Sequence, residues 1–370
     1  MMNRSQDVIV IGGGPAGLAA AISAARQGLR VAVADCAQPP IDKACGEGLM
    51  PDALGALAEL GISLDGCDTG RFRGIRFVGR EGAVEADFPC GAGLGIRRTL
   101  LHGLMAERAA GLGITLLWGA HVSNVKNGQV EVNGETLQCR WIVGADGQNS
   151  RVRNWAGLTS GRDYERRIGL RQHFQIQPWS EFVEIYWGEN RQAYVTPVGS
   201  HDICVALISR HRFPSFDAAL ADFPELWARL ESVPRSTPVK GAMTVTRRLK
   251  SVIRDNIVLI GEASGSADAI TGEGLAISFR QASALGQALA AGELSLYAAA
   301  HRDIATLPHL LGRSMLLMDR HSWVRSRALR AFARRPSLFA RLLAVHVGAV
   351  SWKGFGISGI LNLGWRLLTA

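Results

Sequence analysis

The stretch VIVIGGGPAG, residues 8–17, decides the fold, because it places G-x-G-x-x-G directly after a short apolar strand. An alanine-rich helical pattern and a second strand pattern follow, and the latter ends at Asp35. In this arrangement Gly12 allows a tight turn, Gly14 lets backbone N–H groups approach a pyrophosphate, and Gly17 lets helix and strand pack closely. The helix N-terminus favours negative charge, and an acid at the position of Asp35 accepts hydrogen bonds from a ribose. The stretch therefore predicts a dinucleotide-binding βαβ unit.

Size and composition indicate an ordinary globular protein. The chain has 370 residues, enough for two domains of common size, with 47% hydrophobic and 20% charged residues. Its six cysteines are scattered, with no C-x-x-C pair and no His/Cys cluster at metal spacing, so we expect neither a disulfide framework nor a metal site. The N-terminus lacks the features of a signal peptide, and no run of about 18 apolar residues predicts a membrane span. These features favour a cytoplasmic protein.

The positive charge is concentrated at the C-terminal end. The net charge is +9, and residues 301–370 contain eleven Lys and Arg against two Asp, so the rest of the chain is balanced. A basic segment of this kind suits a peripheral membrane contact, an acidic protein partner or an anionic substrate, while a solvated helical face is the alternative. We expect a small-molecule or carrier-bound substrate and no nucleic-acid partner.

The pattern changes in the middle of the chain. From about residue 168 to 209, successive segments rich in aromatic and β-branched residues predict an antiparallel sheet. Beyond Leu294 the pattern is helical, with Pro308 and Pro336 as expected breaks. The predicted fold class is α/β, a Rossmann-like nucleotide-binding domain with an inserted antiparallel β-sheet substrate domain and a helical C-terminal tail. The expected domains are a discontinuous nucleotide-binding domain (1–70, 91–165 and 250–300), a substrate domain (71–90 and 166–249) and a basic helical region (301–370).

Two further motifs follow the glycine-rich turn. Residues 143–153 read VGADGQNSRVR, and residues 257–263 read IVLIGEA, followed by TGEGL at 271–275. Together with G-x-G-x-x-G, and in this order, they resemble the flavoprotein superfamily of p-hydroxybenzoate hydroxylase, which includes geranylgeranyl reductases and flavin-dependent halogenases. The resemblance covers residue 8 to about residue 290 and implies that the dinucleotide is FAD. Two positions depart from the family's pattern, since Glu262 replaces an Asp and Ala269 replaces a proline.

The resemblance also implies which residues contact FAD. In the family, the acid at the position of Glu262 holds the ribityl chain, and an Arg at the start of a helix contacts the phosphates. Arg98 fits that spacing better than Arg97, and an arginine fork suits phosphate oxygens, although a surface arginine pair is the alternative. The expected cofactor-binding residues are Gly12, Gly14, Pro15, Ala16, Gly17, Asp35, Lys43, Cys45, Gly46, Arg98, Val122, Asp146, Gly147, Gly261, Glu262, Gly272, Gly274 and Leu275.

The loop KACGEGLMP, residues 43–51, falls where the family's chain passes close to the flavin. A Cys-Gly followed by small residues also occurs there in the geranylgeranyl reductase-like branch. Cys45 is therefore a candidate thiol near the ring and Glu47 a candidate proton donor. A glycine loop with one packed cysteine is the alternative.

The stretch QAYVTPVG, residues 192–199, is expected to form a wall of the substrate cavity. Its Tyr-x-Thr-Pro pattern is nearer to the hydroxylase branch than to the Tyr-x-Trp-x-Phe-Pro of the reductases. Tyr194 is a third candidate catalytic residue on this basis. The expected substrate contacts are His173, Tyr186, Tyr194 and Pro197, and core packing explains the His and Tyr positions equally well.

The resemblance implies an FAD-dependent oxidoreductase and leaves its reaction open. The favoured hypothesis is a monooxygenase that uses NAD(P)H and O₂ to hydroxylate or epoxidise an apolar or aromatic substrate, lipid-like or carrier-bound. The alternative is a geranylgeranyl reductase-like enzyme acting on C=C bonds, which the Cys45 loop favours and the Tyr194 strand disfavours. A minor alternative is a non-catalytic relative of the Rab escort kind. A halogenase is disfavoured, because no Trp-x-Trp-x-Ile-Pro motif is present.

Overall fold

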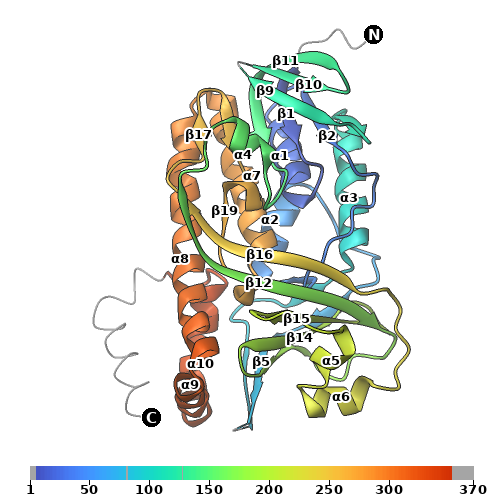
Figure 1. Ribbon diagram of the computed structural model, residues 1–370, viewed down its shortest axis with the longest axis vertical. Helices are drawn as coiled ribbons and strands as arrows, with labels where there is room; N and C mark the ends of the chain where they lie inside the picture. The colour runs from blue at the N-terminus through green and yellow to red at the C-terminus, as the bar shows by residue number, and fades with distance from the viewer. Residues whose placement is uncertain (1–5, 81, 127, 352–370) are drawn as a thin grey trace.

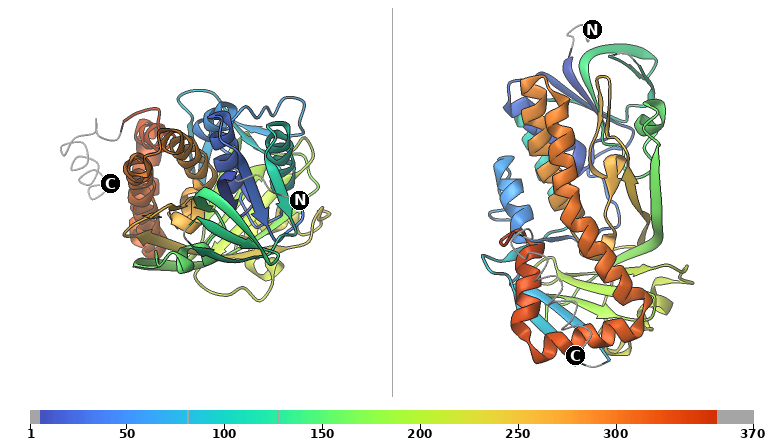
Figure 2. Two further views of the ribbon diagram at one scale, coloured as in Figure 1. Left: turned by 90° about the horizontal axis from the view of Figure 1, so that it is seen from above. Right: turned by 90° about the vertical axis from the view of Figure 1, so that its left-hand side faces the viewer.

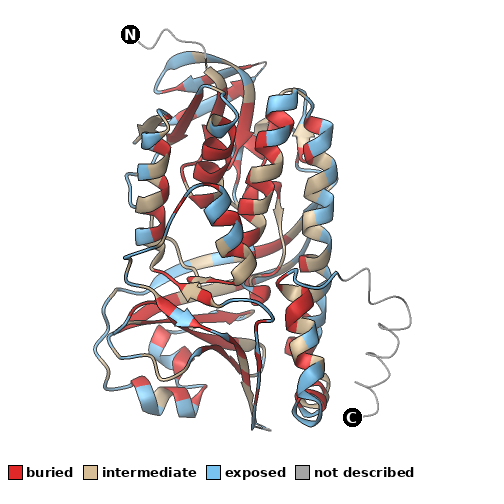
Figure 3. Ribbon diagram, turned by 180° about the vertical axis from the view of Figure 1, so that it is seen from behind, coloured by how far each residue is buried: buried red, intermediate tan, exposed pale blue. Residues whose placement is uncertain are grey.

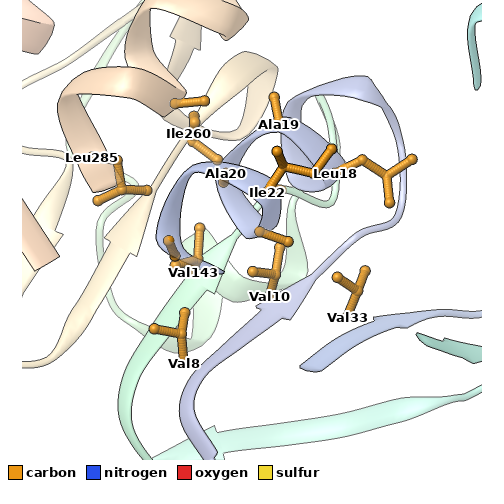
Figure 4. Close-up of a cluster of buried hydrophobic side chains, with 14 of the residues drawn as sticks. Val8, Val10, Leu18, Ala19, Ala20, Ile22, Val33, Val143, Ile260 and Leu285 are labelled. Atoms are coloured by element: carbon orange, nitrogen blue, oxygen red, sulfur yellow. The ribbon is translucent and has the colours of Figure 1, made fainter. Parts of the chain in front are cut away.

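The computed structural model describes residues 6–351 except 81 and 127, and it has the α/β architecture that the sequence predicts (Figure 1). A parallel sheet forms one half of the molecule, in the order β18-β11-β1-β2-β8. Val8, Ile9 and Val10 of the central strand have no exposed surface and pack in an aliphatic core (Figure 4). The strands of this sheet are β1 (Gln6–Ile11), β2 (Val31–Asp35), β8 (Thr115–Trp118), β11 (Glu135–Gly144) and β18 (Ile257–Leu259), with β17 (Ile253–Arg254) antiparallel to β18 at the edge.

Helices cover this sheet and pack closely on one another. α1 (Pro15–Arg26) lies between α7 (Gly274–Ala291) and α3 (Arg98–Gly111), and α2 (Pro51–Glu59) packs against α7. The approach of α1 and α7 requires Gly286, since a Cβ there would lie 2.2 Å from Ser23 Oγ. Hydrophobic burial of these helices against the sheet makes the largest core of the protein.

An antiparallel meander extends the parallel sheet at the top of Figure 1. It consists of β9 (Val122–Lys126), β10 (Gln129–Val132) and the first part of β11. The turn Asn133-Gly134 joins β10 to β11 with positive φ at both residues, as a tight hairpin requires. Asn127, in the other turn, lies outside the described residues.

The second sheet has the order β19-β16-β12-β15-β14-β13-β5-β6. Its strands are antiparallel except for β13 and β5, which run parallel. β12 and β16 are long and connect the two halves of the molecule (Figure 1). The bounds are β5 (Gly74–Gly79), β6 (Gly82–Asp87), β12 (Gly161–Phe174), β13 (Phe182–Trp187), β14 (Arg191–Pro197), β15 (Ile203–Ser209), β16 (Lys240–Leu249) and β19 (Gly265–Ser266).

Three helices end the described chain: α8 (Leu294–Arg320), α9 (Ser322–Arg334) and α10 (Pro336–His346). α8 packs beside α7 and reaches the second sheet, where α9 and α10 cover β5 and β6 (Figure 2). The break expected at Pro308 is wrong, because this proline lies inside α8, whereas Pro336 does begin a new helix. Among the described residues no helix combines the length and apolar character needed to cross a membrane. Residues 352–370, including Trp352 and Trp365 of the basic tail, lie outside the described part of the chain.

The remaining elements are short. A three-stranded sheet joins the two halves, in the order β3-β7-β4. Two short helices cover the outer face of the second sheet, and α4 follows β11. These elements are β3 (Gly48–Leu49), β4 (Gly70–Phe72), β7 (Gly93–Gly95), α4 (Arg151–Trp155), α5 (Phe216–Leu220), α6 (Pro224–Leu230) and the 3₁₀ turns η1 (Gly261–Ser264) and η2 (Ala269–Thr271).

Candidate functional site

A large cavity lies between the parallel sheet and the second sheet. Its volume is about 1180 Å³, above the roughly 300–1,000 Å³ of a pocket for one small ligand. The three sequence motifs meet on its wall, because β1, β11 and β18 are parallel neighbours and the motifs follow their carboxyl ends. Every expected cofactor-binding residue except Gly17 lines this cavity. Gly17 packs behind the turn, where a Cβ would lie 1.8 Å from Gly12 O.

Two helix starts provide a place for a pyrophosphate. α1 begins after Gly14 and α7 begins at Gly274, and neither helix has a side-chain cap at its N-terminus. The first N–H groups of a helix have no partner within the helix, so they attract anions. A Cβ at Gly14 or Gly274 would meet no protein atom within 4 Å, which shows that the space at both helix starts is open to a ligand.

Asp35, at the end of β2, binds the backbone of the glycine-rich turn. Its Oδ2 accepts a hydrogen bond from Gly13 N at 2.6 Å, and its Oδ1 accepts one from Ala37 N at 2.8 Å. A carboxylate has about four acceptor positions. Both oxygens therefore retain capacity for the hydroxyls of a ribose.

His102 of α3 also supports this turn, and sequence reasoning missed it. Its Nε2 lies 2.9 Å from Gly13 O, and burial lowers the pKa of the imidazole, so a neutral ring donates this hydrogen bond. The available signal was its spacing of four residues from Arg98, which places both side chains on one face of a helix.

Arg98 is the one arginine of its pair that fits an anionic ligand. It lines the cavity, and its buried Nε has no hydrogen-bond partner among the described residues. A buried donor without a partner is costly, and a phosphate oxygen would satisfy it. The guanidinium of Arg97 instead binds Asp202, with Nη1 3.0 Å from Oδ2.

Glu262, the residue that departs from the family's Asp, connects three segments of the wall. Its Oε2 lies 2.6 Å from Lys43 Nζ, and a Cβ added at Gly147 would lie 3.9 Å from the same oxygen. The longer side chain thus reaches the loop of residues 43–51. Both partners are about 40% exposed at the cavity, where they can meet the polar ribityl part of FAD.

Asp146 has a structural task in addition to its place on the wall. Its carboxylate accepts hydrogen bonds from Ser150 Oγ, Arg151 N and Val152 N, at distances from 2.5 to 3.1 Å. These contacts bind the N-terminus of α4 and orient the turn at Gly147. The segment is therefore rigid where it meets the cavity.

Glu47 forms a buried pair with His173. Its Oε2 lies 2.6 Å from His173 Nε2, and its Oε1 accepts a hydrogen bond from Arg98 N at 2.9 Å. Glu47 lines the cavity with a φ of 59°, a left-handed backbone that is uncommon outside glycine and concentrated at functional sites. The side chains of both residues are 1% exposed, and His173 lies behind Glu47 and is not part of the wall.

The other ring nitrogen of His173, Nδ1, contacts residues that lie closer to the surface. Nδ1 lies 2.8 Å from Thr237 Oγ1 and 3.1 Å from Arg171 Nη1. Thr237 Oγ1 accepts from His173 N at 3.2 Å, so its hydroxyl is free to donate to Nδ1. Nδ1 is therefore the acceptor, and Nε2 carries the proton toward Glu47. Thr237 is half-buried between exposed residues. Glu47, His173 and Thr237 therefore form a row of hydrogen-bonded side chains from the cavity to the surface.

Two cysteines accompany this pair. Cys45 lines the cavity and accepts a hydrogen bond from Glu47 N at 3.4 Å. Cys204 is buried and bonds Cys45 O, and burial raises the pKa of its thiol, so it is not a thiolate. The fold thus gathers Glu47, His173 and Cys204 so that their ligand atoms lie within 4.8 Å, a grouping that sequence spacing does not reveal.

The candidate substrate residues have different surroundings. Tyr194 lines the cavity, but its hydroxyl donates to Ile270 O at 2.9 Å, and burial raises the pKa of the phenol. Tyr186 points to the opposite face of the sheet, where its ring packs against Phe223. Pro197 is buried under Gly70 and contributes no surface to the cavity.

An apolar wall continues the cavity beyond these polar groups. It comes from the second sheet and from the residue before α2. Its members include Met50, Ile75, Val183, Ile185 and Ile208.

Comparisons with known proteins agree with this geometry. A family model described as FAD binding domain matches residues 5–294. Menaquinone reductase of Mycolicibacterium smegmatis is 29% identical over 334 residues, 81% of this chain and 80% of that protein. Digeranylgeranylglycerophospholipid reductase 1 of Methanothermobacter thermautotrophicus is 27% identical over 321 residues, 79% and 78% of the two chains. A flavoprotein/dehydrogenase of Cytophaga hutchinsonii has the same fold, with a TM-score of 0.84 at 19% identity over 99% of each chain.

Proposed function

The chain belongs to the FAD binding domain family, and from this membership we propose that it is an FAD-dependent reductase that saturates a C=C bond of a lipid-like, isoprenoid substrate. NAD(P)H is the proposed source of electrons. When bound and reduced, FAD supplies a hydride. Gly14, Gly274, Asp35 and Arg98 would hold the cofactor at the positions described above.

The observation that carries the proposal is the row of Glu47, His173 and Thr237. Saturation of a C=C bond requires a proton in addition to a hydride, and Glu47 is an acid on the cavity wall. Glu47 passes a proton to the substrate carbon and takes a replacement from His173 Nε2. His173 recovers a proton at Nδ1 from the Thr237 hydroxyl, which recovers one from water at the surface. Glu47 and Thr237 end with the protons they started with, whereas His173 ends protonated at Nδ1 and must exchange that proton for one at Nε2 before the next turnover.

The shape of the cavity supports an apolar substrate. Its volume of about 1180 Å³ leaves room beside a dinucleotide, and aliphatic residues such as Ile75 and Ile185 line that part of it. The relatives named above are reductases of menaquinone and of a digeranylgeranylglycerophospholipid, which are both lipid-like molecules. A C=C bond in an isoprenoid chain suits such a wall better than a charged aromatic acid does.

A monooxygenase is the second candidate. It is favoured by Tyr194 and Thr196 of β14, which line the cavity and resemble the hydroxylase branch in their Tyr-x-Thr-Pro pattern. In that case O₂ is a co-substrate, and the same apolar wall holds the molecule that is hydroxylated or epoxidised.

Product analysis separates the two candidates. FAD-loaded protein is incubated with NADPH and menaquinone as the probe, once under nitrogen and once under isotopically labelled O₂, and the product is analysed by mass spectrometry. A reductase of the C=C bond yields, in both atmospheres, a product whose two added hydrogens remain after the quinone ring has been reoxidised, because reduction of the ring alone also adds two hydrogens. A product that contains labelled oxygen, and forms only in the presence of O₂, would contradict the proposal and favour the second candidate.

A further inference from the structure

Exposed apolar side chains gather where the cavity opens between β16 and α8. Of the nine large hydrophobic residues exposed in the described part of the chain, four belong to this region. They are Tyr164 of β12 (46% exposed), Met243 of β16 (54%), and Leu310 (46%) and Leu317 (49%) of α8. A contiguous exposed apolar surface of this kind marks an interaction site more often than scattered residues do.

These side chains share one surface. Met243 of β16 and Leu310 of α8 both line the cavity and are both about half exposed, so both lie where the cavity reaches the surface. Leu317 lies seven residues after Leu310, about two helical turns, and so shares its face of α8. The guanidinium of Arg313 lies 5.6 Å from the centre of the Tyr164 ring, which ties β12 to the same surface. Seen from behind, on the side turned away from β12 and β16, α8 also has exposed residues along its length (Figure 3).

Unpaired positive charge surrounds this apolar surface. Arg248, Arg302 and Arg313 line the opening, and no acidic side chain among the described residues forms an ion pair with any of them. Arg248 also faces Arg162 directly across the β12–β16 ladder, an arrangement of like charges that costs stability without a counter-charge. Burial, followed by the positive charges of Arg248 and Arg313, lowers the pKa of His309, so both arginines lie near this residue.

The acidic groups nearby do not cancel this charge. Asp163 binds Arg247, and Glu165 binds Arg210 and Arg320. Asp303 lies next to Arg302 on α8 and is the remaining acid in this part of the helix. We refer to Tyr164, Met243, Leu310, Leu317, Arg248, Arg302 and Arg313 as the mouth patch.

We propose that the mouth patch docks on a bilayer surface that carries anionic phosphate headgroups. Exposed aliphatic and aromatic side chains insert at the level of the headgroups, and arginines bind phosphate oxygens there. The opening of the cavity then faces the membrane, and a lipid-like molecule reaches the apolar wall without crossing water. The protein lies on the bilayer by this surface and needs neither a membrane-spanning helix nor residues 352–370 for this contact.

Vesicle binding tests the proposal independently of turnover. FAD-loaded full-length protein is sedimented with phosphatidylcholine vesicles and with vesicles in which part of that lipid is replaced by phosphatidylglycerol. We expect binding to the anionic vesicles that weakens as salt is added, because the arginine contribution is screened. Absence of binding to the anionic vesicles would overturn the proposal, whatever reaction the flavin carries out.

Matched variants locate the contact. Arg248→Gln/Arg313→Gln should reduce partitioning onto anionic vesicles about 30-fold, because each arginine near an anionic surface contributes roughly fivefold. Leu310→Gln/Leu317→Gln should also reduce partitioning, and it should reduce the binding that remains after salt is added. The control is Arg80→Gln/Leu100→Gln, which removes one charge and one exposed leucine at positions that do not line the cavity. Unchanged flavin content and thermal unfolding show that each variant is folded.

Two results would contradict the proposal. One is equal vesicle binding by wild type and both mouth-patch variants. The other is normal vesicle binding by Arg248→Gln/Arg313→Gln together with a weaker affinity for NADPH but not for NADH, which would assign these arginines to a dinucleotide phosphate.

Discussion

At position 14 a glycine determines whether the pyrophosphate has room. Gly14 has an ordinary φ of −70°, and a Cβ there meets no protein atom. Gly14→Val should therefore fold normally and lose FAD, because its side chain enters only the space of the ligand. The ratio of flavin to protein absorbance after purification measures this, with thermal unfolding as the check on folding. A variant with full flavin content would contradict the assignment of the turn.

Arg98 and Arg97 provide a matched pair of substitutions. Arg98→Leu should weaken FAD binding about 10- to 100-fold, since a hydrogen bond to a charged group contributes roughly 1.5–3 kcal/mol. Arg97→Leu should leave the affinity nearly unchanged, because its guanidinium binds Asp202 instead of facing the cavity with a free donor. Titration of the flavin-free proteins with FAD, followed by fluorescence, measures both. Equal losses in the two variants would mean that Arg98 has no special place at the phosphates.

The proton row makes a third prediction at the same scale. Glu47→Gln should lower kcat by about 100-fold or more, the usual contribution of a general acid, with KM little changed. Thr237→Val removes the hydroxyl that serves His173 Nδ1, so it should lower kcat less and increase the solvent deuterium isotope effect.

Thr115→Val in β8 is the control for Thr237→Val, because it makes the same change in a strand away from the row. It should leave kcat and the isotope effect as in wild type. If Thr237→Val also behaves as wild type in both measurements, the row does not carry the proton.

Like β12 and β16, α8 reaches both halves of the molecule, and it contains buried polar groups. Asp319 binds Gln192 and Arg210 on the second sheet, and Arg167 binds Asp268 of the loop before η2. At the other end of α8, removal from water lowers the pKa of His301 to about 4, and its Nε2 lies 2.9 Å from Ser264 Oγ. Buried groups of this kind are costly to leave unpaired, so α8 has one well-defined position.

His301 makes stability depend on pH in a defined direction. Its folded pKa lies below its unfolded value, so the unfolded chain binds more protons and stability falls as pH falls from about 6.5 to about 4. Between about pH 7 and about pH 5, wild type should lose up to about 2 kcal/mol more than His301→Gln, at 1.36 kcal/mol per pKa unit. Urea unfolding of both proteins at the two pH values measures the difference. Parallel pH dependence in the two proteins would contradict the assignment.

At the element scale, local patterns predicted most of the structure. The βαβ unit and the sheet from about 168 to 209 follow from periodicities of 3.6 and 2 that neighbouring residues determine. The break at Pro308 was wrong for a tertiary reason. A proline removes one helical hydrogen bond, but α8 packs against α7 and η2 on either side of it, and this packing keeps one continuous helix.

At the scale of the whole molecule, the parallel sheet explains why three distant motifs form one site. The loops after β1, β11 and β18 meet because their strands are neighbours. The motifs could therefore be identified in the sequence, and the order of the strands places all three on the wall of one cavity. The pairing of Glu47 with His173 could not be predicted, since the two residues are far apart in sequence and Glu47 lies in a loop while His173 lies in β12. His173 was expected at the substrate, and it lies behind Glu47 instead.

The cavity between the two sheets also sets what a substrate must be. It accepts a dinucleotide along the carboxyl ends of the parallel strands and leaves an apolar space against the second sheet. Both ligands therefore share one cavity, whose wall includes Cys45 and Glu47.

Anaerobic reoxidation of the flavin tests most directly whether the protein is a reductase that passes electrons from FAD to an isoprenoid substrate. Protein loaded with FAD is reduced with one equivalent of NADPH under nitrogen and mixed with menaquinone while the flavin absorbance is recorded. We predict that the absorbance of oxidised flavin returns without O₂, at a rate that depends on menaquinone and is lost in Glu47→Gln. If the flavin stays reduced until O₂ is admitted, and the product then contains oxygen, the protein is not the reductase proposed here.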